Sequence, residues 1–153
     1  MSQRTPVYLD DLSVGDTVLT ESHTIDEQQI VDFATRFDPQ PFHLDRDAAE
    51  GTFFAGLAAS GWHTAALTMR LMVTSGLPLA DGIIGAGGEI SWPRPTRPGD
   101  VLRVRMTVLG IQPSRSRPDQ ALVTVEGDTL NQDGDVVQHL VTRIVVWRRP
   151  SAG

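Results

Sequence analysis

The chain has 153 residues, of which 40% are hydrophobic and 21% are charged, and its net charge is -6 at pH 7. This composition indicates a single globular domain over residues 1–153, and the acidic balance argues against nucleic acid as the main partner. No run of about 18 or more apolar residues occurs, so we expect no membrane span. The N-terminus lacks the apolar segment of a secretory signal, which favours a cytoplasmic location.

Two residue types are absent from the sequence. There is no cysteine, which excludes disulfides, thiolate nucleophiles and cysteine-bound metal centres. There is also no lysine, because all 13 basic residues are arginine, and this excludes Schiff-base chemistry and a P-loop lysine. Any chemistry must come from Asp, Glu, His, Ser, Arg and backbone groups.

The first predicted elements are a strand and a helix. Residues 18–25 alternate between apolar and polar with a period of two, which indicates a strand. Asp26 is a good N-cap, and apolar residues then recur at helical spacing, so we expect a helix over residues 27–37. Residues 38–55 are punctuated by prolines and glycines and predict a long loop, with a short helical turn at residues 45–50. A long ordered loop in a compact domain is usually functional.

A second helix is predicted over residues 61–75. Ser60 is its expected N-cap, and Gly76 followed by Pro78 fits the positions just past its end. Its apolar residues cover most of the circumference, which is typical of a buried helix. A buried helix followed by antiparallel strands predicts an α+β fold in which the sheet wraps around the helix. The strand-like runs are residues 83–92, 101–112, 121–131 and 136–147, with an Asp-Gly hairpin signal between the last two.

Asp38 and His43 are the first candidate catalytic residues, in the stretch D-P-Q-P-F-H. In an extended chain five residues span about 17 Å, which is too far for both side chains to act on one atom. The two prolines favour a turn that would bring them together. A carboxylate and a near-neutral imidazole can then hold a water, take one proton from it and deliver another. The alternative is a turn capped by Asp38 with an ordinary, partly buried His43, and the spacing alone favours this alternative.

The start of the second helix is a candidate oxyanion site. The Gly61 N–H is one of the donors that a helix start leaves unpaired, and a residue without a side chain lets a ligand carbonyl approach closely. The helix dipole favours negative charge at this position, which suits a thioester enolate. The alternative is that Gly61 only relieves crowding.

The other candidate features are weaker. The run G-A-G-G at 85–88 lacks the third glycine of a dinucleotide fingerprint and indicates a bulge, or a close backbone approach to the helix or to a ligand. His23 lies in a strand, packing is favoured for His63 over a place in a pocket, and His139 is expected to be solvated or paired. The acids and histidines show no metal-ligand spacing, so we predict no metal site.

Six arginines are concentrated in residues 94–117. They face either an anionic ligand or the solvent, and the solvated interpretation is favoured for most of them. They are Arg94, Arg97, Arg103, Arg105, Arg115 and Arg117.

Taken together, these residues resemble the MaoC-like family of (R)-specific enoyl-CoA hydratases and dehydratases over nearly the whole chain. The family signature is G-D-x-N-P-x-H, and here the stretch reads F-D-P-Q-P-F-H. The chain departs from the signature at Phe37, where the family has Gly, and at Gln40, where it has Asn. Ser60-Gly61 stands where family members often have His-Gly. The matching positions are Asp38, Pro41 and His43.

The resemblance implies a hot-dog fold, in which an antiparallel sheet wraps a central helix, and a homodimer with the acyl-CoA along the interface. It implies that Asp38 and His43 form the hydratase dyad and that the Gly61 N–H polarises the thioester carbonyl. The reaction would be the addition of water to a trans-2-enoyl thioester of CoA or of an acyl carrier, or the reverse, without a cofactor. The expected substrate-binding residues are Phe42, Phe53, Phe54, Leu57, Ser60, Trp62, Gly87 and Arg94, the last near the CoA phosphates.

Two other functions remain open. A hot-dog thioesterase would use the same dyad for hydrolysis, but its central helix often supplies an acid, and no Asp or Glu occurs between Gly61 and Ser75. A non-catalytic protein that binds acyl thioesters would be stabilised by its ligand without turning it over.

Overall fold

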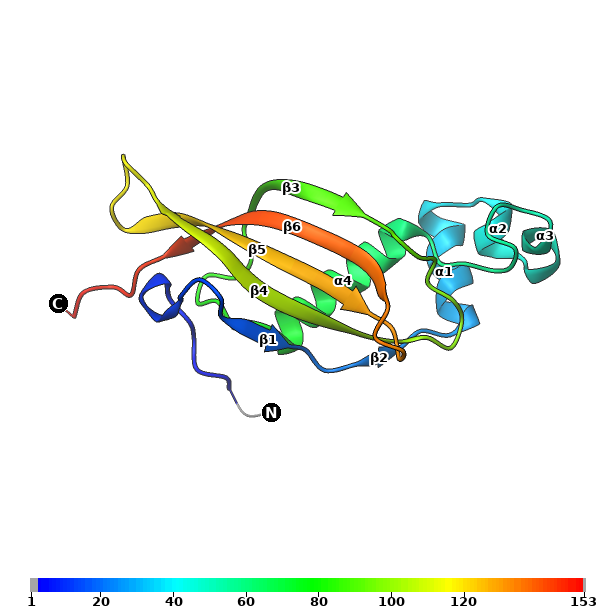
Figure 1. The fold of residues 1–153 in the computed structure, drawn as a ribbon, viewed down its shortest axis with the longest axis horizontal. Coiled ribbons are helices and arrows are strands. Elements are labelled where there is room, and N and C mark those ends of the chain that lie inside the picture. Colours follow the sequence, from blue (N-terminus) through cyan, green and yellow to red (C-terminus); the bar gives the residue numbers. More distant parts are fainter. Residues whose placement is uncertain (1–2, 153) are drawn as a thin grey trace.

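The computed structural model describes residues 3–152, which form one antiparallel sheet and the helices that pack at its concave face and at one end (Figure 1). The strand order is β1-β4-β5-β6-β3, and β2 pairs with β4 beside this path. The strands are β1 (Thr17–Leu19), β2 (His23–Thr24), β3 (Gly85–Ser91), β4 (Val101–Pro113), β5 (Gln120–Leu130) and β6 (Val136–Trp147). The helices are the 3-10 turn η1 (Leu9–Asp11), α1 (Glu27–Phe37), α2 (Pro41–Leu44), α3 (Arg46–Glu50) and α4 (Gly61–Ser75).

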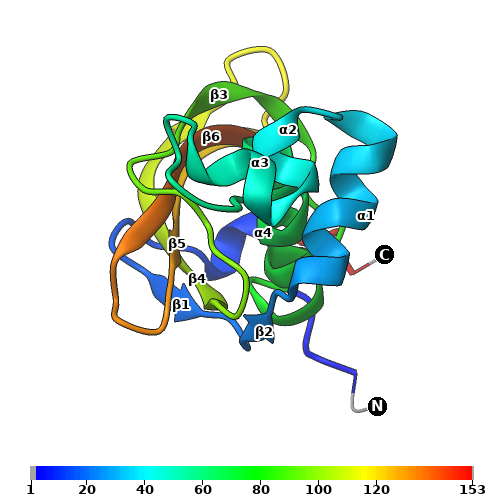
Figure 2. The same cartoon turned by 90° about the vertical axis from the view of Figure 1, so that its right-hand side faces the viewer.

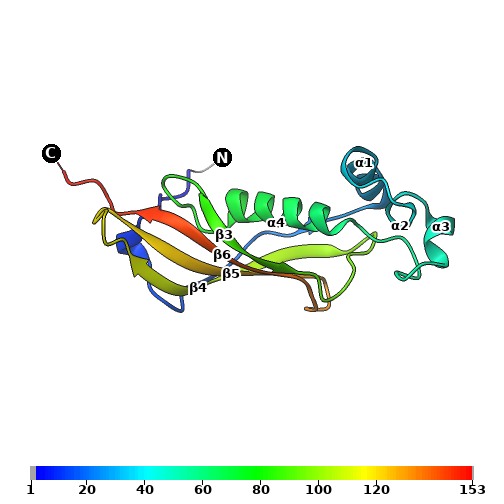
Figure 3. The ribbon, with the colours of Figure 1, turned by 90° about the horizontal axis from the view of Figure 1, so that it is seen from above.

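Helix α4 lies along the concave face of the sheet, while α1, α2 and α3 gather beyond its N-terminal end (Figure 3). The view along the long axis shows the strands curving around α4 (Figure 2). Leu67, Leu71 and Met72 of α4 join one hydrophobic core with the inward-facing residues of the strands, among them Val104 and Val123. The predicted α+β hot-dog arrangement is confirmed.

One side of α4 is open to solvent, which corrects the prediction of a helix buried nearly all round. Trp62, Met69 and Val73 are 61%, 41% and 52% exposed. The sheet covers only the opposite side of the helix, so the single chain leaves this apolar stripe uncovered. No helix within residues 3–152 has the length and the apolar character needed to cross a membrane.

The strand predicted over residues 18–25 is divided into β1 and β2, which is a second correction. Thr20 lies between them, and its hydroxyl accepts the Val104 N–H at 2.9 Å. The next amide, Glu21 N–H, turns away from the sheet to Ser75 Oγ at 2.9 Å. The Thr20 hydroxyl thus accepts a backbone amide that would donate to a backbone carbonyl in a regular strand pair. The strand is interrupted at this residue.

The glycine run at 85–88 forms the start of β3. The register shifts between Gly85 and Gly87, and Gly87 has a φ of 136°, so the predicted bulge is present. A Cβ on Gly88 would collide with the Val141 carbonyl of β6. The close backbone approach is therefore between two strands.

The predicted hairpin between β5 and β6 is confirmed. Gly134 takes the left-handed conformation with φ 80°, and the Asn131 side-chain oxygen accepts the amides of Asp133 and Asp135 at 3.0 Å each.

The region predicted as a long loop, residues 38–55, contains two short helices. Helix α3 lies within the predicted turn, but α2 was not predicted. Pro41 occupies the start of α2, where its missing N–H costs no hydrogen bond. The single turn of α2 folds the chain back, and this places His43 beside Asp38.

Candidate active site

Asp38 and His43 lie in contact where α1 ends and α2 begins. His43 Nε2 is 3.3 Å from Asp38 Oδ2, and His43 is only 4% exposed. Its other nitrogen, Nδ1, is 2.6 Å from the Ala58 carbonyl oxygen. A carbonyl can only accept, so Nδ1 carries the proton, and a neutral His43 presents an unprotonated Nε2 to the carboxylate.

The Asp38 carboxylate accepts a hydrogen bond on each oxygen. Ser60 Oγ donates to Oδ2 at 2.7 Å, and Gln40 Nε2 donates to Oδ1 at 2.5 Å. Burial raises the pKa of Asp38, but these two hydrogen bonds, and the positive charge of His43 when it is protonated, lower it by more, so the pKa lies below the ordinary value of 3.8. Asp38 is therefore ionised at neutral pH. Gln40, which departs from the family signature, contacts the carboxylate directly.

Ser60 is the N-cap residue of α4, as predicted, but its side chain makes no capping hydrogen bond. Its hydroxyl goes to Asp38, while its backbone carbonyl accepts the amides of His63 and Thr64 at 2.9 and 3.1 Å. The N–H groups of Gly61 and Trp62 meet no protein acceptor within the described chain. Two unpaired donors thus stand at the positive end of a 15-residue helix.

The Cα of Gly61 is covered by the indole ring of Trp92. A Cβ at position 61 would lie 2.7–2.9 Å from three atoms of that ring. A hydrogen bond also holds the indole in place, because its Nε1–H donates to the Gln138 side chain at 3.0 Å. Gly61 therefore relieves crowding against the indole, and its N–H has no acceptor within the described chain.

Gly61→Ala is expected to lower the free energy of unfolding by about 1–3 kcal/mol, because the added methyl group overpacks the contact with Trp92. Urea unfolding measures the loss. Gly51→Ala is the matched control, since a Cβ at Gly51 meets nothing within 4 Å. Equal stability of the two variants would show that the indole does not press on position 61.

A cavity of about 250 Å³ lies beside Gly61. Its lining includes Phe53, Phe54 and Arg94, three of the residues predicted to bind substrate. Asp38 and His43 are not part of the lining. The dyad is linked to the cavity through Ser60 and through Phe54, whose ring centre is 5.8 Å from that of His43.

The remaining predicted binding residues lie in different places. Phe42 packs edge-on against His43, with ring centres 4.6 Å apart, so it braces the imidazole. Leu57 is buried in the core, and Trp62 lies on the open side of α4. Gly87 is on β3 and outside the cavity lining. Their roles in substrate binding stay predictions.

Arg97 has a structural position that the sequence did not indicate. Its guanidinium donates to the carbonyl oxygens of Phe54, Gly56 and Leu57, the last two at 2.9 and 3.2 Å. It therefore holds the segment that carries Phe54. The sequence gives no sign of this role of Arg97, because the acceptors are backbone atoms some 40 residues away.

His23 and His63 contact other side chains of the protein. His23 bonds to the Gln29 side chain at 2.7 Å. His63 stacks on Phe33 with ring centres 4.6 Å apart, in agreement with the packing interpretation. Burial, and then the neighbouring His23, lower the pKa of His63.

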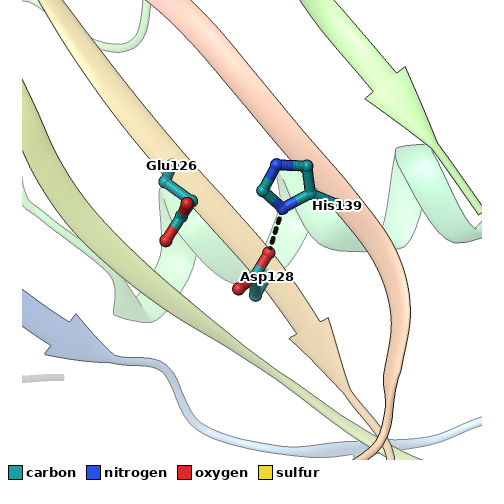
Figure 4. Close-up of side chains that lie close together, drawn as sticks. All are labelled: Glu126, Asp128 and His139. Carbon is teal, nitrogen blue, oxygen red and sulfur yellow. Dashed lines mark hydrogen bonds and ion pairs between the residues drawn. The ribbon is translucent and has the colours of Figure 1, made fainter. Parts of the chain in front are cut away.

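Glu126, Asp128 and His139 form a cluster on the outer face of the sheet, away from α4 (Figure 4). Their potential ligand atoms all lie within 4.8 Å of one another. Sequence spacing did not reveal the cluster because it joins two paired strands, with Asp128 opposite His139. Asp128 Oδ1 is 2.6 Å from His139 Nδ1 and its Oδ2 is 3.2 Å from Arg105 Nη2. Both carboxylate oxygens are thus already paired, and the cluster is a charged network.

Residues 11–129 match the family model of the MaoC like domain. The structure is similar to the crystal structure of a MaoC-like dehydratase from Rhodospirillum rubrum, with 62% identity, a TM-score of 0.93 and coverage of 94% of this chain and 99% of that chain. It is also similar to the R-hydratase PhaJ1 from Pseudomonas aeruginosa, with 27% identity, a TM-score of 0.74 and coverage of 94% and 88%. A 3-hydroxybutyryl-CoA dehydratase from Methylorubrum extorquens is 30% identical over 132 residues, which are 86% of this chain and 82% of that protein. The chain therefore belongs to the MaoC-like domain family.

Proposed function

We propose that the protein is a hydro-lyase that adds water to an enoyl-CoA, or removes it from a 3-hydroxyacyl-CoA, with (R) configuration at the hydroxyl carbon. The observation that carries this proposal is the carboxylate–imidazole pair of Asp38 and His43, 3.3 Å apart, beside the unpaired Gly61 amide. Membership of a dehydratase family supports the reaction class, and the named hydratase and dehydratase relatives support the substrate class.

In this mechanism a water molecule donates one hydrogen bond to Asp38 Oδ2 and one to His43 Nε2. The water oxygen bonds to C3 of the enoyl thioester, and Nε2 accepts the proton that the water loses. The C2–C3 π electrons move toward the carbonyl, giving an enolate. The imidazolium, paired with the Asp38 carboxylate, then returns the proton to C2. One water is added and the dyad ends in its starting state.

The Gly61 amide has the second role in the proposal. The negative charge of the enolate develops on the thioester oxygen, and the Gly61 N–H donates to that oxygen at the positive end of α4. A donor of this kind typically contributes about 10²–10³ to kcat.

The test is the hydration of crotonyl-CoA by the purified protein. We expect the ultraviolet absorbance of the conjugated enoyl thioester to fall, and chiral analysis to identify (R)-3-hydroxybutyryl-CoA. A thiol-reactive dye is read in parallel, because a thioesterase releases free CoA. Thermal stabilisation by crotonyl-CoA with neither reaction would instead identify a binding protein.

We also propose that two copies of the chain form a dimer through β3 and the open side of α4. Among the described residues, β3 pairs on one edge, with β6, and Trp62, Met69 and Val73 are uncovered on α4. A second copy would pair the free edge and cover the apolar side chains. Light scattering should give twice the mass of the chain, and Met69→Glu should shift the protein toward the monomer. A monomer at high protein concentration would contradict the proposal.

A further inference from the structure

Ser60 is buried at the junction between the dyad and the start of α4. It is 0% exposed, and its hydroxyl donates to Asp38 Oδ2 at 2.7 Å. The same oxygen lies 3.3 Å from His43 Nε2. The backbone of Ser60 begins the helix, but its side chain points out of it toward the dyad.

This direction of the hydroxyl has a consequence for the helix start. A serine at the N-cap ordinarily accepts an amide of the first helical turn with its side-chain oxygen. Ser60 makes no such bond. The hydroxyl that would otherwise accept the Trp62 or His63 amide is used for Asp38 instead.

The hydroxyl also limits the movement of Asp38. Gln40 holds the other carboxylate oxygen, but Gln40 is exposed, so water competes for its bond. The bond from Ser60 is made by a fully buried group and has no such competitor. Hydrogen bonds to an ionised carboxylate are stronger than neutral ones and favour the charged form.

We propose that Ser60 is a positioning residue that fixes the Asp38 carboxylate relative to the Gly61 amide. The Asp38 carboxylate acts near C3 of the thioester, and the Gly61 amide acts at its carbonyl oxygen. Ser60 links them, because its side chain holds Asp38 and its backbone precedes Gly61. The hydroxyl does not touch the substrate and acts through Asp38. The inference rests on the proposed function for its catalytic meaning.

Ser60→Ala is expected to lower kcat for crotonyl-CoA by about 10- to 100-fold, the range for a lost hydrogen bond to a charged group, with a smaller change in KM. It should also raise the pKa of Asp38, the carboxylate that must be ionised in the proposed reaction. The Ser60 bond is one reason that the pKa of Asp38 lies below its ordinary value. Without it that pKa rises, so the carboxylate takes up its proton at a higher pH.

Three variants separate the hydrogen bond from packing. Ser60→Cys is close in size but a weak donor, and should behave like the alanine variant. Ser60→Thr keeps the hydroxyl and should restore kcat and the pKa of Asp38. Ser75→Ala removes a hydroxyl from the other end of α4, where it donates to the Leu71 carbonyl at 3.1 Å, and should leave both unchanged.

An NMR titration of the Asp38 carboxyl carbon supplies a measurement that needs no turnover. Its midpoint should rise in Ser60→Ala and Ser60→Cys and stay unchanged in Ser75→Ala, with circular dichroism confirming the fold of each. An unchanged midpoint overturns the inference, as does a raised midpoint with the kcat of the unmodified protein. If the unmodified protein hydrates no enoyl-CoA, the proposed function fails, and the midpoint alone decides whether Ser60 holds Asp38.

Discussion

Asp38→Asn should reduce kcat/KM for the hydration of crotonyl-CoA by about 10²–10⁴-fold, the usual contribution of a general acid–base group. Asparagine has the same shape, so the fold is expected to persist. It carries no charge to stabilise the protonated His43, and one of its two side-chain heteroatoms is a donor that cannot accept from the water or from Ser60. Steady-state rates at neutral pH measure the loss.

The matched control for this variant is Asp47→Asn. Asp47 is an exposed carboxylate on α3, and it has no side-chain hydrogen bond or ion pair within the described chain. Its replacement should leave the rate unchanged. A loss of less than about tenfold for Asp38→Asn would remove Asp38 from the acid–base chemistry.

Asp38→Asn should also change how stability depends on pH. The pKa of Asp38 is lowered in the folded protein, so its ionisation stabilises the fold above the ordinary value of 3.8, and this contribution is lost as the pH falls through the lowered pKa. The stability difference between the unmodified protein and the variant should therefore narrow in strong acid. Thermal unfolding at neutral and acid pH provides the comparison.

His43→Asn should cause a loss of similar size, about 10²–10⁴-fold in kcat/KM. The asparagine amide is placed to keep the donor that His43 Nδ1 offers to the Ala58 carbonyl, 2.6 Å away in the unmodified protein. It cannot supply the second nitrogen that accepts the proton. The variant therefore removes the base but keeps a hydrogen-bond donor for the buried Ala58 carbonyl. His43→Ala would leave that carbonyl without a partner.

The control for the second variant is His139→Asn on the outer face of the sheet. His139 also contacts a carboxylate, Asp128, at 2.6 Å, but it lies away from α4. Its replacement should leave hydration intact. Comparable losses in the two histidine variants would show that the effect at His43 is one of general stability.

Helices α1 and α4 were predictable from the sequence because their signals are local. Asp26 accepts the Gln29 amide at 2.9 Å, as its position before a helical pattern indicated. The bounds of α1 and α4 agree with the predicted ranges. These signals act within a few residues of the chain, where backbone geometry and side-chain reach are already determined.

The errors in the predicted fold arise from contacts between residues that are far apart in the sequence. The break at Thr20 depends on the amide of Val104, 84 residues away. The open side of α4 depends on how far the sheet curves around it. Periodicity reports which side chains are apolar, but not which of them another element covers.

The residue types of the candidate site can be read from the sequence, and the family resemblance supplies the pairing of Asp38 with His43. Spacing alone favoured a simple turn there. Two features of the site depend on tertiary contacts. The position of the proton on His43 follows from the Ala58 carbonyl 15 residues away, and the Ser60 hydroxyl reaches Asp38 across 22 residues. Such contacts arise when α1, α2 and the start of α4 pack together, and no local preference of the chain specifies them.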